Sequence, residues 1–443
     1  MSPRILLAIV VAAGTAAFAQ EPPPVKGADP QLLESVRVVV ERIAGIVHVD
    51  HPGRFVAVRA DEAARVAEAA ARAQRTLPPE IASARGRAWR DLGLGSGTEV
   101  ADLVGAIEAD LAGMTFDASR ARLLVDPLRL RAVEEHGDPR VDAEASVLLA
   151  TGVAADEPVA GHYAAHALLD APSPGVPTTD ALLARAALAE GTANLAAMVL
   201  LFGGVGLESE VFTGTLRPED VLGGRLVPET LRGGSPVVTH MLEFVYLDGF
   251  AQSAVLARQG GFNRLAQERK RRLTTRDVLH LDRPPAPAVD IAEPVVPASL
   301  GLQRADRDTL GEQGIISLVS LLTGKDNLGL IAGDGWEGDG LWRFEGAGGA
   351  ALTVWITRWK TPEELDDFSY ALERCLLARF PGEAVVDDAV RGGRVLARAD
   401  HVYRIARTGG DLWLNVATPE IDAKMGPVPK KKGPEPPRTK VKK

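Results

Sequence analysis

Two histidines and a later glutamate constrain the fold of this chain more than any other feature. His162 and His166 are four residues apart, and Glu190 follows in a second apolar, helix-like run. Side chains at positions i and i+4 of a helix project from the same face, about one turn apart. Two such imidazoles and a carboxylate from a neighbouring helix can supply three ligands to a tetrahedral zinc ion. The pattern therefore predicts two packed helices with a metal site between them.

The same residues also allow a structure without metal. The chain has eight histidines in 443 residues, and in such a chain a pair at this spacing arises by chance roughly one time in eight. The histidines would then pack or hydrogen-bond within the core, and Glu190 would need a polar partner if it were buried. Asp170, one turn beyond His166, is a candidate for orienting that imidazole. Spacing alone leaves the metal site and the structural role open.

The residue after the first histidine decides what a bound metal could do. In zinc peptidases with this pattern it is a glutamate that acts as the general base, whereas here it is Tyr163. A free phenol has a pKa of about 10, but an efficient general base has a pKa near the operating pH. We therefore expect the metal ligands without a competent base. As an alternative, a nearby zinc ion would lower the pKa of the phenol or bind the phenolate as an extra ligand.

Seven short segments follow one another in the order of the motifs of one protein family. They are His162–Asp170, Ala187–Ala193, Phe244–Phe250, Gly260–Phe262, Thr274–Leu281, Leu310–Glu312 and Gly335–Asp339. In this order they resemble the exported bacterial zinc-metallopeptidase-like proteins of the gluzincin type, whose core reads His-Glu-x-x-His with a Glu on a second helix. The resemblance covers roughly residues 30 to 380.

The resemblance implies a zincin-like helical domain that holds zinc with His162, His166 and Glu190, and it implies that His280 lies near this site. The chain departs from the family pattern at four positions, which are Tyr163, Leu169, Thr192 and Leu281. The first stands where the family has its catalytic Glu, and the others replace a Gln, an Asp and a Pro. These changes remove the general base and reduce the polar surroundings of the ligands.

These observations favour a catalytically impaired homologue, or pseudoenzyme, of a secreted zinc metallopeptidase. Such a protein would act as a scaffold or would bind a protein or peptide partner, with or without zinc. Two alternatives stay open. One is an active zinc-dependent hydrolase or peptidase whose general base is Tyr163 or an acid from a distant part of the chain. The other is an exported structural domain without metal.

The first 19 residues have the pattern of a signal peptide. Arg4 is followed by the apolar run 5–13 and by Ala17-Phe18-Ala19, which fits the small-x-small cleavage rule. We therefore expect export to the periplasm or the medium. Cys375 is the only cysteine of the chain, so no intrachain disulfide can form and the core must supply the stability.

Charge and hydropathy narrow the possible partners. The formal net charge is −9, which argues against nucleic acid as the main partner. Beyond the signal peptide no apolar run is long enough to span a bilayer easily, so we expect no membrane span in the mature chain. Residues 421–443 are rich in Lys and Pro and poor in core residues, which predicts a basic disordered tail.

The predicted fold class is α+β. After a linker at 20–30, a mainly helical zincin-like domain covers 31–284, with its metal-site helices at 158–170 and from Thr179 or Asp180 to 201. A Pro-rich linker at 285–297 leads to a smaller α+β domain at 298–420. In that domain Thr361 and Pro362 predict the start of a helix that ends at Arg379. Alternating residues predict strands at 341–345, 351–358, 395–399, 401–406 and 411–417.

Overall fold

The computed structural model of the chain describes residues 30–49, 56–59, 62–111, 114–117, 122–125, 157–169, 175–201, 234–271, 273–281, 283 and 288–425. The predictions for the signal peptide, for Asp170 and for most of the basic tail fall outside these ranges. The described residues have an α+β fold, as predicted. None of the helices in these ranges combines the length and the apolar character that crossing a bilayer requires.

The chain divides into two compact units. The first is Met1–Ser83 with Thr98–Pro287, and the second is Ala84–Gly97 with Ala288–Lys443. The change of unit after Pro287 lies inside the Pro-rich segment 285–297 that was predicted to link two domains.

All six tryptophans of the sequence belong to the second unit, so tryptophan fluorescence reports on that unit.

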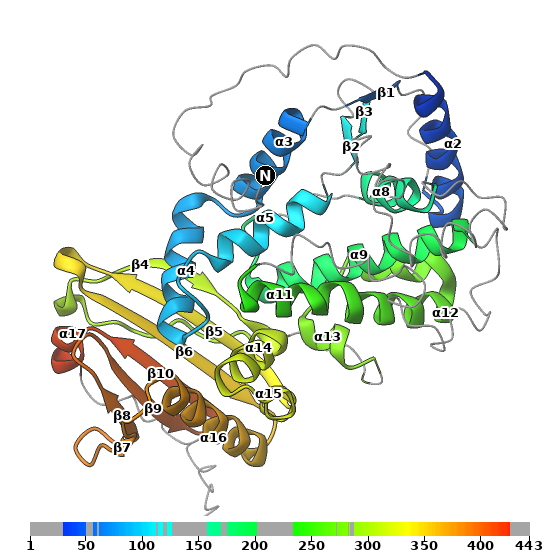
Figure 1. Cartoon of the computed structure of the whole chain (residues 1–443). Helices are drawn as coiled ribbons and strands as arrows, with labels where there is room; N and C mark the ends of the chain where they lie inside the picture. Colours follow the sequence, from blue (N-terminus) through cyan, green and yellow to red (C-terminus); the bar gives the residue numbers. More distant parts are fainter. Residues whose placement is uncertain are drawn as a thin grey trace, which may run out of the picture. The chain divides into compact units, whose positions relative to one another are not determined.

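The first unit is mainly helical (Figure 1). Its helices are α2 (Pro30–Val47), α3 (Glu62–Thr76), α5 (Glu99–Leu111), α8 (Glu157–Leu169), α9 (Thr179–Leu201), α11 (Pro236–Glu243), α12 (Gly249–Glu268) and α13 (Thr275–Leu279), with a π-helical turn, η3 (Phe244–Asp248), between α11 and α12. A small sheet pairs β1 (Val56–Arg59) in parallel with β3 (Arg122–Val125), and β3 antiparallel with β2 (Met114–Asp117).

Helix α9 forms the centre of the first unit. It packs against α2, α8, α12, α13 and η3, and most of its residues from Leu182 to Leu200 are buried. A helix that is apolar on all sides is typical of a protein interior. Because α9 is surrounded, most of the few polar residues that it carries, Glu190 among them, are buried inside the unit.

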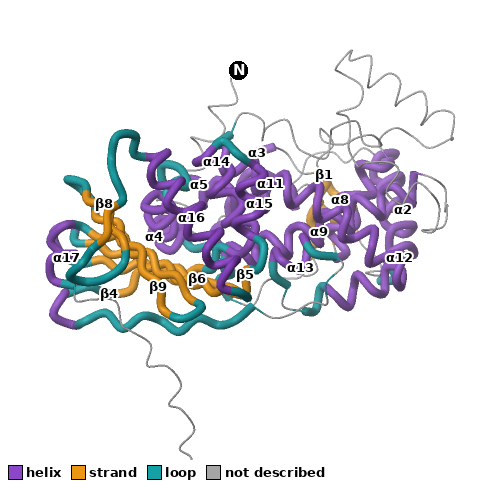
Figure 2. Tube along the Cα trace, turned by 90° about the horizontal axis from the view of Figure 1, so that it is seen from below, coloured by secondary structure: helices purple, strands orange, loops and turns teal. Residues whose placement is uncertain are grey.

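The second unit contains an antiparallel sheet of seven strands in the order β4–β5–β6–β10–β9–β8–β7. Figure 2 shows strands of this sheet in orange. The strands are β4 (Gln303–Asp308), β5 (Trp336–Glu345), β6 (Ala351–Trp359), β7 (Val386–Asp387), β8 (Arg394–Ala397), β9 (Val402–Thr408) and β10 (Asp411–Ala417). The helices are α4 (Pro79–Leu92), whose residues from Ala84 belong to this unit, α14 (Gly311–Thr323), α15 (Asp326–Gly333), α16 (Pro362–Arg379) and α17 (Pro419–Lys424). The predicted helix 362–379 is confirmed, and the Thr361 side chain caps it.

Alternate residues of this sheet face two different layers. On one face, Trp342 and Ile356 belong to a core cluster that includes Ile291 from the segment before β4. On the other face, Trp355 packs edge-on against Phe368 of α16, with 5.5 Å between the ring centroids. Because both faces are covered, the central strands are apolar on both sides.

The structure differs from two predicted boundaries. The segment 285–297 is not a free linker throughout, because Ile291 is only 4% exposed and the Val289 N–H donates to the Glu337 carbonyl oxygen at 2.7 Å. The solvated tail does not begin at residue 421, because Ile421 of α17 is buried in the same core cluster. Proline and lysine content predicts solvated chain, but single apolar side chains are enough to hold these segments on the sheet.

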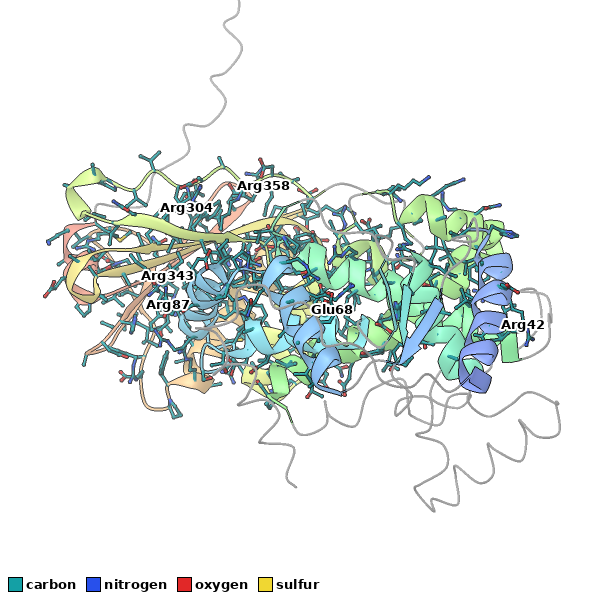
Figure 3. The ribbon with its side chains drawn as sticks, turned by 90° about the horizontal axis from the view of Figure 1, so that it is seen from above. Arg42, Glu68, Arg87, Arg304, Arg343 and Arg358 are labelled. Carbon is teal, nitrogen blue, oxygen red and sulfur yellow. The ribbon has the colours of Figure 1, made fainter. Side chains whose placement is uncertain are left out.

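Residues 84–97 join the second unit, although the sequence placed them in the first domain. Arg87 on α4 forms an ion pair with Glu345 of β5 at 2.6 Å. Arg343 donates to the same carboxylate, and Figure 3 shows it close to Arg87. Arg87 and Glu345 are 258 positions apart in the sequence, so no local pattern could have predicted the contact.

One buried carboxylate joins three elements of the second unit. Asp339 of β5 accepts hydrogen bonds from the backbone N–H groups of Leu310 and Gly311, at the start of α14, both at 3.0 Å. It also accepts from the indole N–H groups of Trp336 at 3.1 Å and Trp355 at 3.0 Å. Burial raises the pKa of Asp339 to about 6, so at neutral pH the carboxylate is ionised and held by four donors.

Replacing this carboxylate should destabilise the second unit. An Asp339→Asn change turns one acceptor oxygen into a donor that faces buried N–H groups, and each buried donor left without an acceptor costs about 1–3 kcal/mol. We expect the free energy of unfolding at pH 7 to fall by at least ~2 kcal/mol in urea denaturation followed by tryptophan fluorescence. Asp367→Asn, at an exposed position of α16, is the control and should leave the midpoint unchanged. An equal loss in both variants would contradict the role of Asp339.

Candidate metal centre

Helices α8 and α9 carry the three predicted metal ligands. His162 and His166 lie on α8, and Glu190 lies near the middle of α9. The two helices pack against each other, and their observed ends agree with the predicted ranges to within one residue at each end. Side chains four residues apart on α8 therefore face a single carboxylate of α9, as the spacing predicted.

The start of α9 is fixed one residue earlier than predicted. The hydroxyl of Thr178 accepts a hydrogen bond from the Ala181 N–H at 3.3 Å, which is the usual contact of a helix cap. Asp180, one of the two residues predicted to begin the helix, accepts from the backbone N–H and the hydroxyl of Thr275 at 2.8 and 2.7 Å. These bonds attach α13 to α9 and fix the position of the residues that follow α13.

The three candidate side chains meet at their ligand atoms. The two Nε2 atoms of His162 and His166 are 3.1 Å apart. The Glu190 carboxylate lies 3.3 Å from His166 Nε2 through Oε1 and 3.5 Å from His162 Nε2 through Oε2. Among the residues that the structure describes, this is the one group of three or more His, Cys, Asp or Glu side chains whose ligand atoms converge in this way, within 4.8 Å of one another.

The donor set and its spacing fit a zinc ion. Zinc binds imidazole nitrogen and carboxylate oxygen at about 2.0–2.2 Å, so neighbouring ligand atoms of a tetrahedral site are roughly 3.3–3.5 Å apart. The observed separations of 3.1, 3.3 and 3.5 Å are close to these values. The same distances also permit direct hydrogen bonds between the imidazoles and the carboxylate, which is the arrangement expected without metal.

The site is buried on one side and reaches solvent on the other. The side chains of His166 and Glu190 are 2% and 3% exposed, whereas that of His162 is 15% exposed. A buried carboxylate needs a positive or hydrogen-bonding partner, and the histidines supply one.

Glycines allow the helices of the site to approach closely. A Cβ atom on Gly191 would lie 2.0 Å from the carbonyl oxygen of Gly249 on α12, and a Cβ atom on Gly249 would lie 2.3 Å from that of Ala187. Gly161 on α8 is similar, because a Cβ atom there would lie 2.7 Å from Leu200 of α9. The glycine next to Glu190 therefore lets α9 approach α12 more closely than any other residue would.

Tyr163 occupies the position after the first histidine, as the sequence requires, and it is buried. Its ring packs edge-on against the His162 imidazole, with 5.1 Å between the centroids and an interplanar angle of 85°. This contact restricts the orientation of His162. It gives Tyr163 a packing role that needs no proton transfer.

His280 does not join the three ligands. It follows the last residue of α13 and lines a separate pocket with residues of α12. It is also not part of the group of ligand atoms that lie within 4.8 Å of one another. The resemblance implied a place for His280 near the metal; the structure shows that it lines a pocket to which none of the three ligands contributes.

Two further polar residues lie close to the site in the fold. Asn194 is one turn beyond Glu190 on α9 and is 2% exposed, and among the described residues its side-chain nitrogen has no acceptor. Asp248 ends the π-helical turn that packs against α9, and burial raises the pKa of its carboxyl to about 6. The i+4 spacing from Glu190 could have indicated Asn194, but no local pattern indicates Asp248.

Comparison with known proteins finds a match for only part of the chain. A family model described as "Domain of unknown function (DUF8575)" matches residues 298–424. The matched segment belongs to the second unit and contains none of the three candidate ligands. No curated protein and no solved structure matches the chain. The site in the first unit therefore has to be judged by its geometry and chemistry.

A side chain at Gly191 should force α9 and α12 apart. We expect Gly191→Ala to lower the free energy of unfolding of the first unit by about 1–3 kcal/mol, the usual cost of overpacking. Circular dichroism at 222 nm during urea denaturation measures this loss. In Gly105→Ala, where nothing lies within 4 Å of the new methyl group, the helix should instead gain about 0.5–1 kcal/mol. If both variants behaved alike, the close crossing would have no energetic role.

The raised pKa of Asp248 predicts a pH-dependent stability. Because the folded pKa of about 6 lies above the ordinary value, the fold favours the neutral acid. This contribution is complete below about pH 4 and is lost as the pH rises through 6. Asp248→Asn cannot ionise, so its advantage over the parent should shrink by about 1–2 kcal/mol between pH 7.5 and pH 4.5. Urea denaturation followed at 222 nm tests this, and a constant difference across that range would contradict it.

Proposed function

We propose that the first unit is a degenerate zincin-like domain that binds zinc through His162, His166 and Glu190, and that the chain is an exported, catalytically impaired relative of zinc metallopeptidases. The observation that carries the proposal is the meeting of two Nε2 atoms and one carboxylate at separations of 3.1–3.5 Å. The order of motifs along the chain supports the family, and the pattern of the first 19 residues supports export.

Each of these residues would have a separate role in metal binding. His162 and His166 would bind the metal as neutral imidazoles through Nε2, and Glu190 would supply the one negative charge of the ligand set. Zinc with three protein ligands keeps a fourth position open and acts there as a Lewis acid. Tyr163 is packed against His162 and stands where the family has the glutamate whose carboxylate, as general base, would take a proton from water. The site thus retains the means to bind a carbonyl or carboxylate group of a partner, but it has no general base beside the first histidine.

A second candidate function is hydrolysis with a base from elsewhere in the chain. Asp248 is the acid that favours it, because it immediately precedes Gly249, whose carbonyl oxygen lies against Gly191 beside Glu190. A pKa of about 6 is closer to that of an efficient general base than the ordinary value of a carboxylic acid. No contact between Asp248 and the three ligands supports this alternative, so binding without turnover stays the main proposal.

Metal content tests the site directly. Elemental mass spectrometry of residues 20–443 should find about one zinc per chain, and the double variant His162→Ala/His166→Ala should lose it, because two of three ligands are gone. His280→Ala is the matched control and should keep its zinc. Absence of zinc from all three proteins would contradict the proposed site and would favour the metal-free structural domain.

Activity separates the two functional candidates. The zinc-loaded chain should not cleave casein or a peptide library at a rate that a chelator abolishes. If it did, and if Asp248→Asn removed the cleavage while zinc stayed bound, the hydrolase alternative would replace the main proposal.

A further inference from the structure

One buried side chain near the candidate metal centre has a hydrogen-bond donor that no acceptor satisfies. Asn194 of α9 is 2% exposed, and among the described residues its Nδ2 atom has no partner. Burying a donor without an acceptor lowers the stability of a fold. In native proteins such a group is explained by a role in a functional site or by a bound water or ion.

Helix geometry directs this amide toward Glu190. The two residues are four positions apart on α9, so they share one face of the helix. Side chains of a helix lean toward its N-terminus, so Asn194 lies over the turn that carries Glu190. Polar side chains at this spacing are close enough to form a hydrogen bond.

The two oxygens of the Glu190 carboxylate face the two imidazoles. Oε1 lies 3.3 Å from His166 Nε2, and Oε2 lies 3.5 Å from His162 Nε2. An imidazole can donate from Nε2 only while that nitrogen carries a proton. These two contacts can therefore be hydrogen bonds only in a chain whose histidines do not bind a metal through Nε2.

Metal binding would change what the carboxylate requires. A nitrogen that binds zinc has no proton to donate, so neither imidazole would still donate to Glu190 through Nε2. A four-coordinate zinc site with three protein ligands needs one oxygen of a carboxylate, and ligating carboxylates are in turn hydrogen-bonded by neighbouring groups. The second oxygen of Glu190 would then accept a hydrogen bond, and a carboxylate oxygen has two lone pairs for this purpose.

We propose that Asn194 is a positioning residue for the metal centre. Its Nδ2 donates to the Glu190 oxygen that does not bind the metal, and this bond forms only when the metal is bound. The inference rests on the proposed function, because Asn194 gains its partner in the zinc-bound chain alone. The same amide therefore lowers the stability of the metal-free fold and raises its affinity for zinc.

A second buried donor lies at the crossing of α9 with α12. Ser253 of α12 is fully buried, and among the described residues its Oγ has no partner. A Cβ atom on Gly191 would lie 2.4 Å from this Oγ, so Ser253 lies against Gly191. Glu190 faces the histidines of α8 instead. We therefore assign the role to Asn194 and expect Ser253 to have no part in metal binding.

Two measurements on one variant of the full mature chain test the proposal. Asn194→Leu keeps the branched shape of the side chain and removes the donor. Zinc titration in competition with a chromophoric chelator should show an affinity about 10- to 100-fold below that of the parent, the usual loss when a residue that supports a ligand is replaced. Without metal, the variant should unfold at a temperature roughly 2–4 °C higher in circular dichroism at 222 nm, because it no longer buries an unsatisfied donor.

Thr192→Val is the matched control on the same helix. The Thr192 hydroxyl is also buried, but it donates to the Leu188 carbonyl oxygen at 2.6 Å, so it is satisfied whether or not a metal is bound. Thr192→Val should bind zinc like the parent, and so should Ser253→Ala.

The outcomes separate this inference from the proposed function. A parent chain that binds no zinc would overturn both. Zinc binding of equal strength in the parent and in Asn194→Leu would overturn the inference alone. A metal-free Asn194→Leu that is less stable than the parent would also overturn it, because the amide would then have a structural role. Weaker zinc binding together with a more stable metal-free fold is the result that we expect.

Discussion

The candidate metal centre depends on the close approach of α9 to α12. Gly191 and Gly249 let the two backbones approach to a distance at which any side chain would overlap a carbonyl oxygen. This contact holds the middle of α9 in place, and with it the residue next to Gly191. Glu190 can then face α8 inside an apolar interior, where its charge is tolerable because two imidazoles surround it. The packing of α9 against α12 thus determines where the three candidate ligands lie relative to one another.

Because packing fixes the positions of the ligands, the chain can retain the three ligands without a general base. His162, His166 and Glu190 are mutual partners, and the last two are buried, so replacing any one would leave the others poorly satisfied. The residue at position 163 has to pack beside His162, but it does not have to contact the metal. A tyrosine there keeps the helix packed. The chemistry and the stability of this site are therefore separable, which is the physical basis for proposing a binding protein of zincin type.

The second unit is held by buried charges whose partners are far apart in the sequence. Asp339 is satisfied by four donors from three elements, and Arg343 is buried beside Asp91, which α4 supplies. These residues are expensive to bury singly, and each is stable only because its partner is buried with it. The family model matches 298–424, which leaves out α4. The matched segment therefore lacks the α4 partners that this sheet uses in the present chain.

The sequence by itself determined the features that local rules control. The i, i+4 spacing placed both histidines on one face of α8, the Thr361–Pro362 pair set the start of α16, and alternation indicated most of the strands of the second unit. The tertiary structure alone decided the assignment of residues 84–97 to the second unit, the pocket that holds His280, and the partial burial of Asp248. The reason is physical: caps and periodicity act over a few residues, whereas burial and ion pairing join residues that can be more than 200 positions apart.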